Sequence, residues 1–102
     1  MVNPRVPHLF GVTLDSNGVA GSQVLAINKT TQEKQRKATD SNKIAIFDAA
    51  EFTSGYSASD VIQFRNVGSS VGQSEATISD ATGGLQEVSI TCAAAPTVAV
   101  NL

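Results

Sequence analysis

Apolar and polar residues alternate along this chain in short runs that are separated by turn-forming residues. In the first run, every second residue from Phe10 to Leu14 is apolar, which places these side chains on one face of an extended strand. Asn17 and Gly18 follow, and this dipeptide is the strongest short signal for a tight turn between strands. A period of two predicts strands rather than helices for most of the chain.

The same pattern predicts further short strands at regular spacing. They are expected at residues 8–14, 22–28, 33–39, 44–47, 61–67, 74–79 and 85–91, with residues 97–102 as a last strand or arm. About seven to eight strands at intervals of about 8–12 residues are typical of an all-β sandwich. The one helical turn is expected at residues 48–52, with Asp48 as the N-cap and Glu51 three residues later.

Two of these runs indicate how the sheets meet solvent. Residues 24–27 are consecutively apolar, which favours a strand covered on both sides, one side by the core and the other as a contact surface. Residues 33–39 are very polar, which is typical of a solvated edge strand.

The chain of 102 residues is one domain in size. We divide it into an N-terminal arm (1–8), the β-sandwich (9–92) and a C-terminal strand or arm (93–102). Charged residues make up 16% of the sequence, against about a quarter in ordinary soluble domains, and Ser, Thr, Asn and Gln replace them. Such surfaces are common in extracellular β-domains and in the coats of particles.

Two segments carry a family resemblance. The stretch Gly11-Val-Thr-Leu-Asp15-Ser-Asn-Gly18-Val-Ala-Gly21-Ser-Gln-Val24 resembles the start of carboxypeptidase-regulatory-like (transthyretin-like) and collagen-adhesin B-type domains, in which a strand, an Asn-Gly turn and a second strand recur. The stretch Tyr56-Ser-Ala-Ser-Asp60-Val-Ile is similar to their tyrosine, spacer, Gly-Asp and apolar strand element. The resemblance extends over residues 9–91 and implies a single Ig-like or transthyretin-like β-sandwich.

The chain departs from that family at two turns. Ser59 stands where a glycine is usual, and Lys43 replaces the common Asp-x-Gly turn ending. The adhesin relatives often carry an internal Lys–Asn isopeptide bond, but the first strand here has no lysine, so we do not expect that bond. Small standalone versions of the fold resemble virion decoration or accessory proteins of tailed viruses.

No grouping of residues predicts catalysis, a cofactor or a metal. His8 is the only histidine and has no serine or cysteine partner at a recognisable spacing, so we expect it at the surface or an interface. Cys92 is the only cysteine, which excludes an intramolecular disulfide and favours a buried thiol. The carboxylates near turns lack the alternating spacing of a calcium loop; they are Asp40, Asp48, Glu51 and Asp60.

Asp60 and Tyr56 have local interpretations. The Asp60 carboxylate is expected to accept hydrogen bonds from nearby backbone amides of its turn. Tyr56 is interpreted first as a corner tyrosine with its ring in the core, and alternatively as an exposed platform for a glycan or a base. Gly83 and Gly84 precede a strand without the Lys or Ser/Thr partner that a phosphate-binding loop needs.

Charge is distributed unevenly along the sequence. Residues 1–43 carry six basic and three acidic side chains, and residues 44–102 carry one basic and six acidic ones. The basic residues gather around one predicted hairpin: Lys29, Lys34, Arg36, Lys37 and Lys43. Since this hairpin has no aromatic residue and the sequence pI is about 5.1, we do not expect nucleic-acid binding. It is a solvated edge, or it contacts an acidic partner or another copy of the chain.

Together these observations predict a non-catalytic structural protein. The most concrete hypothesis is a virion accessory protein, made in the host cytoplasm and present in many copies, that decorates or braces a capsid or tail through strand edges and through arms at residues 3–7 and 98–102. Residues 1–8 lack the apolar segment of a signal peptide, and no run predicts a membrane helix. The alternative is a carbohydrate- or ligand-binding module that uses the loops near Tyr56 and residues 68–72.

Overall fold

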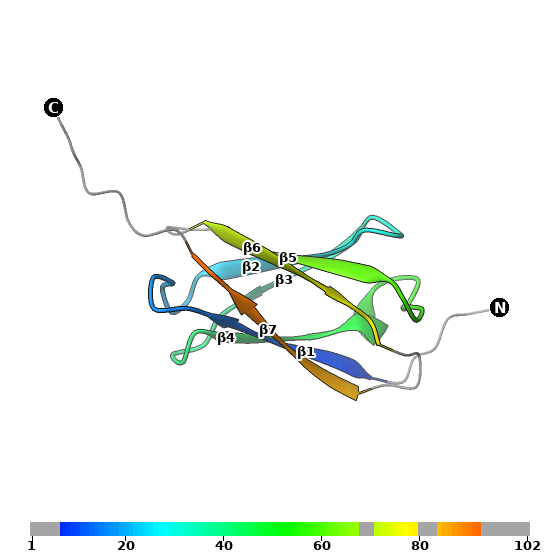
Figure 1. Ribbon diagram of the computed structural model, residues 1–102, viewed down its shortest axis with the longest axis horizontal. Coiled ribbons are helices and arrows are strands. Elements are labelled where there is room, and N and C mark those ends of the chain that lie inside the picture. The colour runs from blue at the N-terminus through cyan, green and yellow to red at the C-terminus, as the bar shows by residue number, and fades with distance from the viewer. Residues whose placement is uncertain (1–6, 68–70, 80–83, 93–102) are drawn as a thin grey trace, which may run out of the picture.

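The computed structural model describes residues 7–67, 71–79 and 84–92, and within them it forms two β-sheets (Figure 1). The three-stranded sheet has the order β4-β1-β7, and its strands are β4 (Ile44–Asp48), β1 (His8–Leu14) and β7 (Gly84–Ile90). The four-stranded sheet has the order β3-β2-β5-β6, and its strands are β3 (Glu33–Ala38), β2 (Gln23–Asn28), β5 (Val61–Val67) and β6 (Gly72–Thr77). The predicted all-β sandwich is therefore confirmed.

The pairing of the strands brings distant parts of the sequence together. β1 runs antiparallel to β4 and parallel to β7, so the first and last described strands are neighbours. In the other sheet every described pair is antiparallel. The chain crosses between the sheets after β1, β3, β4 and β6, which ties the two layers into one unit.

The core lies between the two sheets and follows the predicted period of two. Along β1, Phe10, Val12 and Leu14 are at most 3% exposed. The ring of Phe64 on β5 lies 5.2 Å from that of Phe10 and 5.6 Å from that of Phe47 on β4, measured between centroids. Each such fully buried side chain contributes about 1.5–3 kcal/mol of transfer free energy, so this aromatic contact is a main link between the sheets.

The turns confirm some local predictions. A 3₁₀ turn, η1 (Ala49–Glu51), follows β4, and the Asp48 carboxylate caps it by accepting a hydrogen bond from the Ala50 amide at 2.9 Å. Ser59 and Lys43, the two departures from the family pattern, both have left-handed backbone, with φ of 76° and 66°. Glycine adopts this conformation without steric cost, so both side chains sit where the backbone favours glycine.

Both ends of β6 differ from the sequence prediction by two residues, whereas the ends of the other strands differ by at most one. β6 begins at Gly72 rather than at residue 74, and ends at Thr77. Gly72 pairs with Asn66, and a Cβ atom at this position would lie 2.5 Å from the Thr91 carbonyl oxygen, so the chain there approaches too closely for any side chain. From the sequence, Gly72 is expected in the loop at residues 68–72, whereas the structure places it in β6, where it allows close packing within the sandwich.

The predicted arms lie mostly outside the described residues. β1 begins at His8, the last residue of the predicted N-terminal arm. The predicted strand at 97–102, the arm segment 98–102 and residues 3–6 of the arm segment 3–7 fall outside the described part of the chain, as do residues 68–70 and 80–83. Pro7 is described, and its carbonyl accepts a hydrogen bond from the Gly84 amide at 3.2 Å.

Candidate interaction faces

The element from Tyr56 to Asp60 is a structural corner. Tyr56 is fully buried, with its ring centroid 5.5 Å from that of His8, so the interpretation of Tyr56 as an exposed platform is wrong. The Asp60 carboxylate accepts hydrogen bonds from the Ser57 amide at 2.9 Å and from the Asn28 side chain at 3.0 Å, which confirms its predicted role. Asn28 in turn accepts from the Thr30 amide, so the network ties the loop before β5 to the β2–β3 turn.

His8 is buried, which corrects the expectation of a surface histidine. Its Nε2 lies 2.7 Å from the Gln86 side-chain oxygen. That oxygen also accepts from the Ser79 amide, and the Gln86 amide group donates to the Thr77 carbonyl, so His8 Nε2 is the donor. The Gln86 side chain thereby links β7 to His8 on β1 and to the backbone at the end of β6. The period of two along β1 places His8 on the same side as Phe10, and this signal could have predicted its burial.

Cys92 is a buried thiol, as predicted. Burial and the nearby Asp15 carboxylate raise the pKa of Cys92 above its ordinary value of 9.0. The Cys92 amide donates to that carboxylate at 3.2 Å, and the Asn17 side chain donates to the Cys92 carbonyl. These contacts fix the end of β7 to the β1–β2 turn, and the raised pKa works against thiolate chemistry.

Most of the carboxylates near turns accept hydrogen bonds from backbone amides of their own turn. The Asp40 carboxylate accepts from the Asn42 amide at 2.8 Å and from the Ile44 amide at 3.0 Å, and Glu51 is exposed on η1. Among the described residues, no three His, Cys, Asp or Glu side chains gather where they could hold a metal ion. No helix in the described ranges is long and apolar enough to cross a membrane.

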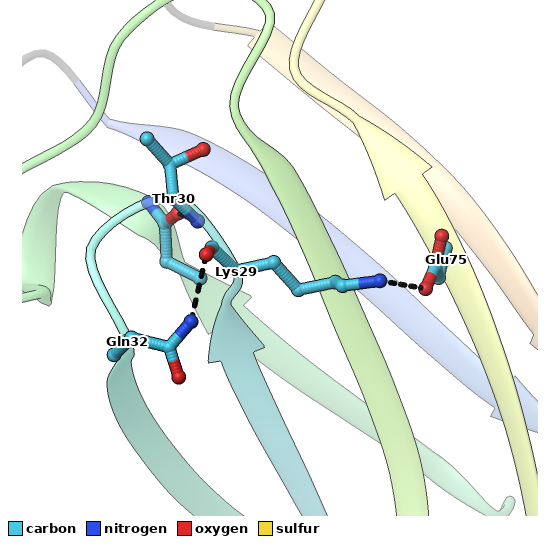
Figure 2. Close-up of polar contacts among 5 residues, drawn as sticks. Lys29, Thr30, Gln32 and Glu75 are labelled. Carbon is cyan, nitrogen blue, oxygen red and sulfur yellow. Dashed lines mark hydrogen bonds and ion pairs between the residues drawn. The ribbon is translucent and has the colours of Figure 1, made fainter.

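The predicted basic hairpin is divided by the fold. Lys29 reaches over β5 and forms an ion pair with Glu75 on β6 at 2.9 Å, while the Gln32 side chain donates to the Lys29 carbonyl (Figure 2). Lys43 lies in the turn before β4 and points to the Ser16 carbonyl at 3.5 Å. Lys37 lies on the other side of β3 from Lys34 and Arg36, because side chains alternate along a strand.

The outer side of the three-stranded sheet is aliphatic with two carboxylates, and we call it the acidic face. Its residues lie in three rows across β4, β1 and β7: Asp48, Leu9 and Leu85; Ile46, Gly11 and Glu87; Ile44, Thr13 and Ser89. Leu85 is 62% exposed and Ile46 is 48% exposed, the others being half-buried or exposed.

Gly11 lies at the centre of the acidic face, and nothing inside the molecule requires a glycine there. Its φ is not positive, and a Cβ atom would meet only the Ile46 Cδ1 atom, at an ordinary 3.8 Å. A glycine in the middle of a strand costs about 0.5–1 kcal/mol relative to alanine. The missing side chain leaves the β1 backbone open on the outside, between Ile46 and Glu87.

The outer side of the four-stranded sheet is its counterpart, and we call it the basic face. Its rows run across β3, β2, β5 and β6: Lys34, Ile27, Gln63 and Glu75; Arg36, Leu25, Arg65 and Gln73; Ala38, Gln23 and Val67. Leu25 and Ile27 are half-buried and form an aliphatic strip along β2. Sequence reasoning missed Arg65, although the alternation of β5 places it opposite the buried Ile62 and Phe64.

A groove of about 490 Å³ borders the basic face. Its lining consists of Arg65, Asn66, Val67, Val71, Gly72 and Gln73. Val67 and Val71 flank residues 68–70, which lie outside the described part of the chain. No aromatic ring lines the groove, so it lacks the stacking surface that sugar binding commonly uses.

No family model, no curated protein and no solved structure matches this chain. The two outer faces therefore carry what can be inferred about function.

Proposed function

We propose that this chain is a non-catalytic structural protein that binds and braces neighbouring subunits of a larger assembly. The observation that carries this proposal is the acidic face, where Ile46 and Leu85 are about half exposed or more beside Leu9 and Ile44. Exposed aliphatic side chains that lie close together on one face favour a surface that contacts another protein. Gly11 at its centre adds an open backbone that a partner approaches closely.

The buried reactive side chains support a binding role over a catalytic one. The sequence has one histidine, His8, and one cysteine, Cys92. Both side chains are buried and make structural contacts. His8 donates to Gln86, and the Cys92 pKa is raised rather than lowered. A nucleophile or general base needs access to substrate, which neither residue has.

The concrete form of the proposal is a multicopy accessory protein of a virion capsid or tail, made in the host cytoplasm. It rests on the resemblance of residues 9–91 to carboxypeptidase-regulatory-like domains, whose small standalone versions resemble virion accessory proteins. The left-handed backbone at Ser59 and Lys43 agrees with the turn pattern of that resemblance only. The basic face carries no aromatic residue on which a base would stack, so protein subunits are favoured over nucleic acid as partners.

The carbohydrate-binding alternative depended on an exposed Tyr56, and the Tyr56 side chain is buried. The chain has one tyrosine, four phenylalanines and no tryptophan, and all five aromatic side chains are buried. We therefore do not carry this alternative further.

The test is whether the chain co-sediments with particles. Particles from a culture that produces the protein are separated on a density gradient, and the chain is detected with an antibody. We expect it in the particle band at a fixed ratio to the main shell protein. A chain found only at the top of the gradient would contradict the proposal.

A second arm of this experiment uses purified protein added back to stripped particles. Ile46→Lys, on the acidic face, is expected to reduce rebinding, whereas Val19→Lys, at an equally exposed apolar position on neither face, is the matched control. Equal rebinding of both variants would show that the acidic face is not the contact surface.

A further inference from the structure

We propose that the acidic face of one copy packs on the basic face of another copy, so that the chains join head to tail. This inference rests on the proposed function and names the partner of its contact surface. The two faces lie on opposite sides of the sandwich, because each is the outer side of a different sheet (Figure 1). One molecule therefore has both surfaces free at the same time.

The first argument is the complementarity of charge. The acidic face carries Asp48 and Glu87, and the basic face carries Lys34, Arg36 and Arg65. Glu75, the carboxylate on the basic face, is already paired with Lys29. That pair is the one salt bridge within the described ranges, so Glu87 and the three cations of the basic face have none there.

The second argument is that the charges flank a central strand in the same way on both faces. Asp48 and Glu87 lie on the strands on either side of β1, and Arg36 and Arg65 lie on either side of β2. Neighbouring strands are about 4.8 Å apart, so each set of charges is spread over roughly 10 Å. When β2 of one copy lies over β1 of another, cations meet carboxylates on both flanks.

The third argument is the shape of the two centres. On the acidic face Gly11 leaves the middle of β1 without a side chain, and on the basic face Leu25 and Ile27 stand along the middle of β2. The half-buried aliphatic strip of one copy thus meets an open backbone on the other. This contact supplies the external reason for Gly11 that the single chain does not provide.

A pair of like faces fits less well. Two acidic faces bring Glu87 and Asp48 against carboxylates of the same sign, and two basic faces bring arginines together, which costs binding free energy. A head-to-tail contact also leaves one face of each kind open at the ends of a pair. Copies therefore add on in rows or close into rings, in keeping with a multicopy protein.

The small area of the contact favours weak association. The acidic face spans three strands of up to seven residues, or about 14 by 24 Å at ordinary strand spacing and rise. This is roughly 340 Å², below the about 800 Å² per partner of a stable interface. We therefore expect weak association in free solution that is strengthened where copies are held side by side on a particle.

The experiment is sedimentation velocity of the purified chain from about 10 μM to about 1 mM at low salt. The wild type is expected to associate with rising concentration, and Glu87→Lys and Arg36→Glu are each expected to weaken association about tenfold. Mixing these two variants restores it, because each keeps the face that the other has lost. Glu51→Lys and Lys37→Glu make the same charge changes off the two faces and serve as controls.

Each other outcome overturns the inference. A wild type that stays monomeric at about 1 mM excludes a self-contact of this kind. Loss of association in Glu87→Lys alone, with no effect of Arg36→Glu, shows that the basic face is not the partner of the acidic face. Stronger association of Glu87→Lys than of the wild type indicates a pair of acidic faces instead. Equal effects of the control substitutions indicate a response to net charge only. A chain that self-associates but is absent from particles refutes the proposed function, whereas a particle-bound chain that never self-associates refutes only this inference.

Discussion

The inner and outer sides of the same strands can be compared by asking which contacts account for the residue types found there. On the inner side of β1, Phe10 and Val12 are at most 1% exposed, and their neighbours in the core account for them. On the outer side of the same strand, Leu9 and Gly11 lie beside exposed Ile46 and Leu85, and the single chain does not account for them. Folding thus explains the inner side, whereas our proposal is that contacts with other molecules explain the outer side.

The largest effect is expected from removing an inner aromatic side chain. Phe64→Ala leaves a cavity against the rings of Phe10 and Phe47 and is expected to lower the free energy of unfolding by about 3–5 kcal/mol. Ile46→Ala, on the outer side, is expected to change it by less than about 0.5 kcal/mol. Urea denaturation measures both variants. Similar losses for the two would remove the distinction between the sides.

A second comparison sets a buried carboxylate against an exposed one. Asp60 and Asp40 each accept two hydrogen bonds, but Asp60 is 6% exposed and Asp40 is exposed. Asp60→Ala leaves the buried Asn28 amide without its acceptor and is expected to cost about 2–3 kcal/mol. Asp40→Ala is expected to cost about 1 kcal/mol or less, because water replaces its carboxylate. The same denaturation measurement contradicts the account if Asp40→Ala costs as much.

A smaller and opposite effect is expected at a turn. Ser59 has φ of 76°, so Ser59→Gly relieves steric strain and is expected to raise the free energy of unfolding by about 0.5–1 kcal/mol. The control is Ser57→Gly, whose φ is not in the positive range and which is expected to destabilise slightly. A rise in the thermal midpoint for Ser59→Gly alone checks this prediction.

The smallest effect is expected in alkaline solution. The pKa of Cys92 is raised in the folded chain, so the unfolded chain loses the thiol proton first. The stabilising contribution is complete below the ordinary pKa of 9.0 and is lost as pH rises through the folded-state pKa. The difference in stability between the wild type and Cys92→Ala should therefore shrink above pH 9.0. A difference that is constant up to high pH would contradict the raised pKa.

Local sequence patterns predicted most strand boundaries well. They failed where a contact between distant parts of the chain determines where a strand begins. The period of two located β1 to β5 within one residue of their ends, and Asp48 and Asp60 take their predicted turn roles. The start of β6 at Gly72 depends on the Thr91 carbonyl nearby, which no local pattern reveals.

The candidate faces were predicted only in part. The apolar run at residues 24–27 predicts a strand with one side in the core and the other as a contact surface. Leu25 and Ile27 lie on the outer side of β2, and contact there stays a prediction. The parallel pairing of β1 with β7, which brings Leu85 and Glu87 beside Leu9 and Gly11, could not be predicted, because it joins strands from opposite ends of the described chain.

The most direct test of the claim that the outer faces make the contacts is a concentration series of methyl spectra from labelled Ile, Leu and Val residues. We expect the methyl signals of Ile46, Leu85 and Leu25 to shift as protein concentration rises, while those of the buried Ile62 and Ile90 stay constant. Val19, exposed but on neither face, provides the reference. Shifts confined to Val19, or no shifts at about 1 mM, would contradict the account.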